Sequence, residues 1–350
     1  MTNLSFLFSN VKRRDSNIEL LRIVSMFLVL VAHACYTSLG APSQEEVITN
    51  YGSSFLRGAC ESFSEICVNV FVLISGWYGI RVKAIRFVGL IFQVLFISII
   101  LYVLLLSIGF TETMNTSKWI ELLLFKCGTY WFIRSYIILY IFAPILNTFT
   151  DYCTKYQLKR FLVAFYVLQT VYGFYNSGGW FSSGYSPLSF MGLYLLARYI
   201  RLYPNKYIKF HPRTDFALYI MFSLFTVFCS LSLTYLFGKG GTILFQYSSP
   251  LVIISSLYFF LFFTKFSFSS RFINCVSSSC FAVYIFHCSP FLFHSYYTEV
   301  IHNWFEQETT FPFFVNTTML ILIYFTLAVF FDKVRLLFWE GICRILKIND

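Results

Sequence analysis

Apolar stretches of about 20 residues recur along the whole chain, each long enough for a helix to cross a hydrocarbon core about 30 Å thick. They are too long, and too uniformly apolar, for the strands of a membrane barrel. With 58% hydrophobic and only 12% charged residues, a water-soluble core could not hide the apolar side chains. The sequence therefore predicts an all-α, polytopic membrane helix bundle.

We expect ten spans in one integral-membrane domain covering residues 1–350, because no Pro-, Gly- or Ser-rich linker divides the chain. If the arm 1–17 is cytoplasmic, 20 of the 26 lysines and arginines fall in inside segments and four in outside segments. This asymmetry indicates that the tail 335–350 is cytoplasmic too, and it explains the net charge of +10 without nucleic-acid binding. The first span also resembles a cleavable signal peptide, an alternative that the charges leave open. The expected spans are 18–39, 59–80, 87–110, 129–149, 160–176, 187–203, 216–237, 249–266, 277–297 and 313–334.

Charged and polar side chains in the first span are the leading functional candidates, because ionisable groups are costly at bilayer depth. Arg22 and His33 are eleven residues apart, which places them on one helical face about 16 Å apart. Glu19 precedes Arg22 by three residues and can pair with it. A snorkelling arginine and a hydrogen-bonding histidine would also explain the two residues separately. Their shared face favours a functional role.

The second span adds a polar residue, Asn69, and a cationic cluster, Arg81, Lys83 and Arg86, follows it. The positive-inside rule alone would explain the cluster. Glu61 and Glu65 lie four residues apart at the outer end of this span. They fit two interpretations equally: orienting a sugar hydroxyl or a histidine, or lying in a wet loop.

The ninth span brings together Tyr284, His287 and His294, and the two histidines are expected on one helical stripe. A packed or interfacial role is the favoured interpretation for His294. The ten cysteines show no metal-ligand spacing and most lie in apolar runs, so no metal is expected. Phosphate-loop, serine-elbow and zinc-protease motifs do not occur.

Four stretches carry a resemblance to the acyltransferase-3 family of bacterial inner-membrane acyltransferases. They are the Arg22-to-His33 spacing, "VNVFVLISG" at 68–76, "YWFIRSYIILYIFAPILN" at 130–147 and "VYIFH" at 283–287. The resemblance covers essentially the whole chain. It implies about ten helices and the acylation of surface glycans, commonly as O-acetylation, from cytoplasmic acyl-CoA.

The resemblance assigns Arg22 and His33 to the family's essential pair. Lys83 and Arg86 occupy the spacing of its two-arginine motif, with lysine in place of the first arginine, so charge is kept and bidentate phosphate recognition is not. Asn69 stands where the family usually has an acidic residue. The proline that usually follows the ninth-span histidine is displaced to Pro290.

The resulting hypothesis is transfer of an acyl group, expected to be acetyl, from acyl-CoA to a hydroxyl of an extracytoplasmic glycan. Arg22, Arg81, Lys83 and Arg86 would bind the coenzyme phosphates. His33 would be the general base or the acyl carrier, with His287 and Glu19 beside it in the catalytic group. Asn69, Ser75 or Tyr284 would stabilise the oxyanion. A multi-span transporter, or a non-catalytic relative, is the alternative; the lipids of the membrane are the other expected partner, and the oligomeric state is left open.

Overall fold

The computed structural model describes residues 15–126, 128–175, 179–204 and 208–346, so most of the N-terminal arm lies outside the described residues. The chain is 81% helical and its described residues contain no strand, which confirms the all-α prediction. Within them, seven helical stretches are long and apolar enough to cross a membrane: Ser16–Thr37, Tyr51–Tyr78, Ala84–Ser107, Thr116–Tyr152, Pro212–Phe237, Gly241–Thr264 and Thr310–Ile345.

The predicted count of ten spans is not confirmed, because three of the expected spans correspond to shorter helices. Helix α9 (Lys155–Gln169) has 15 residues and continues as a π-helical turn, η3 (Thr170–Tyr175). Helix α10 (Pro187–Leu202) has 16 residues and begins at a proline. A helix rises about 1.5 Å per residue, so α10 is marginal for a full crossing. Helix α9 with η3 is long enough, but this stretch is not among those that are also apolar enough.

The ninth expected span, 277–297, is divided rather than continuous. Helix α13 (Arg271–Ser277) and helix α14 (Cys280–His287) precede a π-helical turn, η6 (Phe293–Thr298), and helix α15 (Glu299–Gln307). Pro290 lacks an N–H and disfavours helical backbone at the residue before it, which accounts for the interruption after His287. The prediction that His287 and His294 share one helical stripe is therefore wrong.

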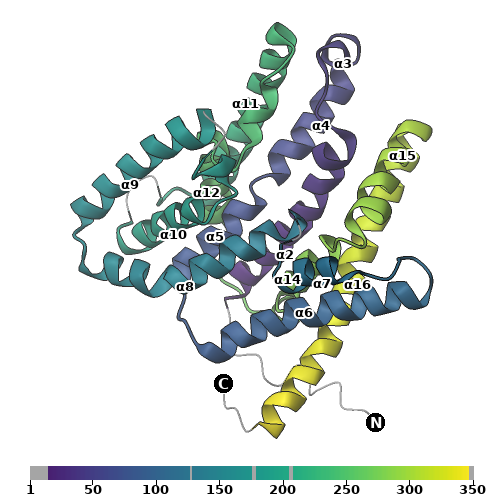
Figure 1. Cartoon of the computed structure of the whole chain (residues 1–350). Helices are drawn as coiled ribbons and strands as arrows, with labels where there is room; N and C mark the ends of the chain where they lie inside the picture. The colour runs from purple at the N-terminus through teal and green to yellow at the C-terminus, as the bar shows by residue number, and fades with distance from the viewer. Residues whose placement is uncertain (1–14, 127, 176–178, 205–207, 347–350) are drawn as a thin grey trace. The chain divides into compact units, whose positions relative to one another are not determined.

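The helices form two compact units, each assembled from segments distant in sequence, and the prediction of one domain stays a prediction. Unit 1 contains residues 1–30, 82–133 and 269–350. In it α14 packs against helix α6 (Ala84–Ser107) and helix α16 (Thr310–Ile345). Helix α16 is the long yellow helix of Figure 1, and only 22% of its most apolar window is buried, as suits contact with lipid. Unit 1 also holds α2 (Ser16–Ala32), α7 (Thr116–Leu123), α13 and α15.

Unit 2 contains residues 31–81 and 134–268. Helix α11 (Pro212–Phe237) packs against α12 (Pro250–Thr264) and α4 (Tyr51–Ser64), and α10 packs beside α5 (Cys67–Tyr78). The apolar window of 51–78 is 78% buried, so α4 and α5 supply much of the interior of this unit. Most of α8 (Trp131–Tyr152), with α9 and α10, completes it (Figure 1).

The close contact between α5 and α10 depends on Gly76. A Cβ atom at this position would lie 2.4 Å from the carbonyl oxygen of Tyr194 and 2.9 Å from the Cβ of Ala197. The Tyr194 hydroxyl donates to Asn147 Oδ1 at 2.6 Å and accepts from the Ile80 N–H at 2.9 Å, so α10 is held on both sides of the glycine. The absence of a side chain at Gly76 is therefore what lets α5 and α10 approach this closely.

A short helix outside the membrane spans, α3 (Gln44–Thr49), is fixed to α4 by an arginine. Ser43 caps it, with its hydroxyl accepting from the Glu46 N–H, and the Glu46 carboxylate accepts in return from the Ser43 N–H. Arg57 donates to Glu46 Oε1 at 2.6 Å and to the carbonyl oxygen of Gly40 at 2.5 Å. One guanidinium therefore ties α4 to the loop before α3 and to α3 itself.

This clamp should weaken in acid. Partial burial acts to raise the pKa of Glu46, but the hydrogen bonds from Ser43 and Arg57 outweigh it and hold the pKa below its ordinary value of 4.5. A lowered folded-state pKa gives stabilisation that is complete above pH 4.5 and lost as the pH falls through the folded pKa. We expect Glu46→Gln to lower the melting temperature of the purified protein at pH 7, with the difference shrinking towards pH 3.

Glu45→Gln, at the exposed neighbour in α3, is the matched control and should change the melting temperature little at either pH. A difference between Glu46→Gln and the natural sequence that persists unchanged at low pH would contradict the assignment of the Glu46–Arg57 pair.

Candidate functional site

Glu19 and Arg22 lie on α2 in unit 1. Glu19 is buried, and its Oε2 accepts from the Ser277 hydroxyl at 2.6 Å. Arg22 Nε lies 3.9 Å from the same oxygen, which confirms the expected pairing as an ion pair without a direct hydrogen bond. The Arg22 side chain keeps 38% of its surface exposed, so its guanidinium is accessible to an anionic ligand. A second contact, from the Ser16 hydroxyl to Asn274 at 2.9 Å, fixes the start of α2 on α13.

His33 begins a π-helical turn, η1 (His33–Thr37), where a regular helix was expected through residue 39. Cys35 leaves helical backbone geometry, with φ −89° and ψ −107°. The Ser38 hydroxyl donates to the His33 carbonyl oxygen at 2.6 Å and occupies an acceptor that the widened turn would otherwise leave. From Ser16 to Ala32 the helix is regular, so the spacing of Arg22 and His33 is that of an ordinary α-helix.

Glu19 is distant from His33 along the same helix. Fourteen residues separate them, about 21 Å at 1.5 Å per residue. Glu19 is therefore too far along the helix for a direct contact with His33. Its placement fits a positioning residue for Arg22.

Tyr284 and His287 lie on α14 in unit 1, and both are buried. The Tyr284 hydroxyl donates to the Thr129 carbonyl oxygen at 2.7 Å. The imidazole of His287 is fully buried, with its ring centroid 4.2 Å from that of Tyr297 and 5.3 Å from that of Phe293. The Tyr297 hydroxyl donates to the Leu30 carbonyl oxygen at 2.7 Å. His287 therefore packs on a tyrosine that holds the stretch of helix leading into the His33 turn.

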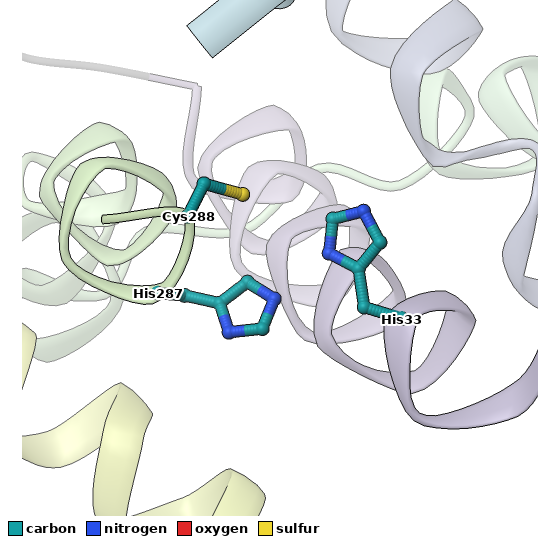
Figure 2. Close-up of side chains that lie close together, drawn as sticks. All are labelled: His33, His287 and Cys288. Carbon is teal, nitrogen blue, oxygen red and sulfur yellow. The ribbon is translucent and has the colours of Figure 1, made fainter. Parts of the chain in front are cut away.

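The three histidines considered in the sequence have different surroundings. His33 is half-buried, His287 is buried, and His294 is exposed in η6. Figure 2 shows His33 on the turn that continues α2, and His287 and Cys288 at successive residues where α14 ends. An imidazole and a thiol are metal-ligand types, but two donors from one turn do not make a closed zinc site, which takes four ligands. The expectation that no metal takes part stays a prediction.

The proposed oxyanion donors are already engaged in hydrogen bonds. Asn69 is fully buried in unit 2 and donates from Nδ2 to the Tyr247 carbonyl oxygen at 3.1 Å. The Ser75 hydroxyl donates to the Phe71 carbonyl oxygen at 3.0 Å and lies 3.3 Å from the Tyr136 hydroxyl. The Tyr284 hydroxyl donates to Thr129, so Ser75 and Tyr284 would each have to exchange a partner to stabilise an oxyanion. Asn69 has a second N–H that could do so without such an exchange.

Glu61 and Glu65 are buried, so the interpretation of these carboxylates as wet loop residues is wrong. Each side chain is 7% exposed. Glu61 Oε2 accepts from the Tyr36 N–H at 3.2 Å, and Glu65 is hydrogen-bonded to the Tyr247 side chain. Glu65 stands at the joint between α4 and α5, where the predicted single helix over 59–80 is interrupted.

The cationic cluster around the start of α6 is exposed. Arg81 and Lys83 precede α6, with Lys83 at its N-cap, and Arg86 lies in its first turn. All three side chains are exposed. Cations at a helix N-terminus oppose the helix dipole, so these residues contribute little to helix stability.

Two residues important to these surroundings were missed in the sequence: Tyr247, against Glu65 and Asn69, and Tyr297, against His287. Tyr247 lies more than 170 residues from Asn69 in the sequence. Tyr297 lies ten residues from His287, on the other side of a helix break. The chain has 25 tyrosines, and no spacing distinguishes these two from the rest.

Long apolar helices with charged and polar residues along their length define this chain as an integral-membrane helical protein. A family model described as acyltransferase domain, that of the acyltransferase-3 family, matches residues 15–331. The chain therefore belongs to this family. Comparison with curated proteins and with solved structures gave no match.

Proposed function

We propose that this membrane acyltransferase moves an acetyl group from acetyl-CoA to a hydroxyl of an extracytoplasmic glycan. The observation that supports this most is the pair Arg22 and His33 on one helix, in a chain that belongs to an acyltransferase family. Arg22 offers an accessible cation, and His33 offers an imidazole eleven residues further along. A coenzyme bound by phosphate at one end of the helix would present its thioester towards the other.

In the direct route the acceptor hydroxyl oxygen attacks the thioester carbonyl carbon while the neutral imidazole of His33 takes the hydroxyl proton. The tetrahedral intermediate then expels the CoA thiolate, which receives that proton. In the second route His33 itself attacks the thioester, releases CoA and passes the acetyl group to the acceptor. Both routes yield an acetyl ester and CoA.

The two routes are separated by trapping the enzyme with labelled acetyl-CoA in the absence of acceptor. Label that remains on the denatured protein, and that His33→Ala removes, supports the acyl-histidine route. Full turnover with no trapped label supports direct transfer.

The proposed activity is tested with the purified protein in sealed vesicles, given labelled acetyl-CoA on one side and surface polysaccharide on the other. We expect label in the polysaccharide, and mass spectrometry of the surface glycan from deletion and complemented strains should reveal the same ester. Saturable uptake of a solute without acylation would favour the transporter. Neither acylation nor uptake would favour a non-catalytic role.

Coenzyme affinity should depend on the exposed cationic cluster. We expect the combined variant Arg81→Gln, Lys83→Gln, Arg86→Gln to raise the Kd for CoA about tenfold, since three exposed contacts of about 0.5 kcal/mol each sum to that factor. The measurement is isothermal titration at low salt, because salt screens such contacts. Arg213→Gln, at another exposed arginine, is the control. An unchanged Kd in the triple variant would remove the cluster from the coenzyme site.

A further inference from the structure

Two buried carboxylates in unit 2 have no cationic partner. Glu61 and Glu65 are each 7% exposed and lie one helical turn apart. Among the described residues neither forms a salt bridge, and the nearest arginine in α4, Arg57, pairs with Glu46 instead. Buried charges are normally paired because desolvation without a counter-charge is costly. Without a cation such carboxyls are stabilised by binding a proton, and a cationic ligand would let them bind it as carboxylates.

Near these carboxylates in the sequence, two further buried acceptor atoms have no hydrogen-bond donor. Asn69 is fully buried and one turn beyond Glu65; its Nδ2 donates to Tyr247, and its Oδ1 has no partner. Gln246, next to Tyr247, likewise has a buried Oε1 without a partner. Buried polar atoms are satisfied in the great majority of cases, so these acceptors would suit a ligand that donates hydrogen bonds.

Aromatic rings line the same place. The Tyr247 and Tyr185 ring centroids are 4.9 Å apart, and the Tyr185 carbonyl oxygen accepts from the Ser135 hydroxyl at 3.1 Å. Tyr185 keeps 40% of its surface exposed, so this aromatic pair borders the surface of the unit. Aromatic faces attract ammonium groups as well as binding apolar surface.

We propose that Glu61, Glu65, Asn69 and Tyr247 form a binding site for an ammonium group, and that the acceptor of this transferase therefore carries a free amino group. An ammonium supplies both the missing charge and three N–H donors. A divalent metal fits less well, because within the described part of the chain no third carboxylate, imidazole or thiol joins these two carboxylates as a ligand group. The ammonium positions the acceptor, and a hydroxyl elsewhere on it receives the acyl group. The assignment of an amino group to the acceptor rests on the proposed function.

The test measures binding to the purified full-length protein without any acyl donor, so it does not depend on transferase activity. Glucosamine, glucose and N-acetylglucosamine are compared by thermal shift and titration at one ionic strength. We expect glucosamine to bind at least tenfold more tightly than the other two. Glu65→Gln, which keeps the shape of the side chain, should remove that preference, and Asn69→Asp should strengthen it. Glu45→Gln in exposed α3 is the matched control and should leave it unchanged.

Equal binding of the three sugars, or an unaltered preference in Glu65→Gln, would overturn the site. Stabilisation by sodium ions equal to that by glucosamine would assign it to an inorganic cation instead and would overturn the inference. Should Glu65→Gln fail to fold, Asn69→Asp alone decides, through a gain in affinity or its absence. Acylation of amine-free glycans with no preference for amino sugars would remove the acceptor assignment and leave the proposed function intact.

Discussion

Replacing His33 by alanine is expected to abolish acyl transfer while leaving the protein folded and able to bind CoA. A positioned general base contributes about 10²–10⁴-fold to a rate, and a covalent carrier contributes more because its loss removes the route altogether. The substitution removes a half-buried imidazole from the first residue of a π turn whose backbone is held by Ser38 through the His33 carbonyl oxygen, a contact that alanine keeps. We therefore expect kcat to fall by at least this factor while the melting temperature changes little.

The exposed His294 in η6 provides the matched control, because His294→Ala removes an imidazole of the same kind outside the proposed site. Transfer should continue in that variant at the natural rate. His33→Ala that retains transfer within a factor of two or three would end the proposed mechanism in both of its routes.

The largest effect on stability is expected at Gly76. In Gly76→Ala the new methyl group would lie 2.4 Å from the Tyr194 carbonyl oxygen, a backbone atom that cannot rotate away. Overpacking of a tight interior typically costs about 1–3 kcal/mol, and a backbone contact this close places Gly76 at the upper end of that range. The melting temperature and the yield of folded protein in detergent should both fall.

Gly341→Ala is the corresponding control in α16, where a Cβ atom would meet nothing within 4 Å. Alanine is the better helix former, so this variant should be as stable as the natural protein or slightly more stable. Comparable losses in the two variants would show that the contact between α5 and α10 is looser than the geometry requires.

The features that the sequence predicted well are those set by local composition and spacing. Apolar runs predicted helices near most of the observed ones, and the three-residue spacing of Glu19 and Arg22 predicted their ion pair. The division of 277–297 was signalled only by Pro290, and hydropathy continued through the break. The length of α10 depends on its N-terminal proline and on packing against α5, which hydropathy does not encode.

The candidate site was predictable in part for the same reason. Arg22 and His33 stand out because charge is rare in an apolar run, and that argument requires no tertiary contact. The burial of Glu61 and Glu65 could not be predicted from the sequence, since two glutamates with this spacing also suit a solvent-exposed helix end. Their burial depends on Tyr36 and on Tyr247, which lies more than 170 residues from Glu65, and the sequence offers no measure of such contacts.

The widened turn at His33 has a consequence for insertions and deletions in this helix. Cys35 leaves helical backbone geometry, so the helix is kinked two residues after His33. A change of one residue within 34–37 would alter the chain beyond this kink and leave the eleven-residue interval from Arg22 to His33 unchanged. If the proposed function holds, the loop after the kink can vary in length while the distance between the coenzyme-binding arginine and the proposed base is kept.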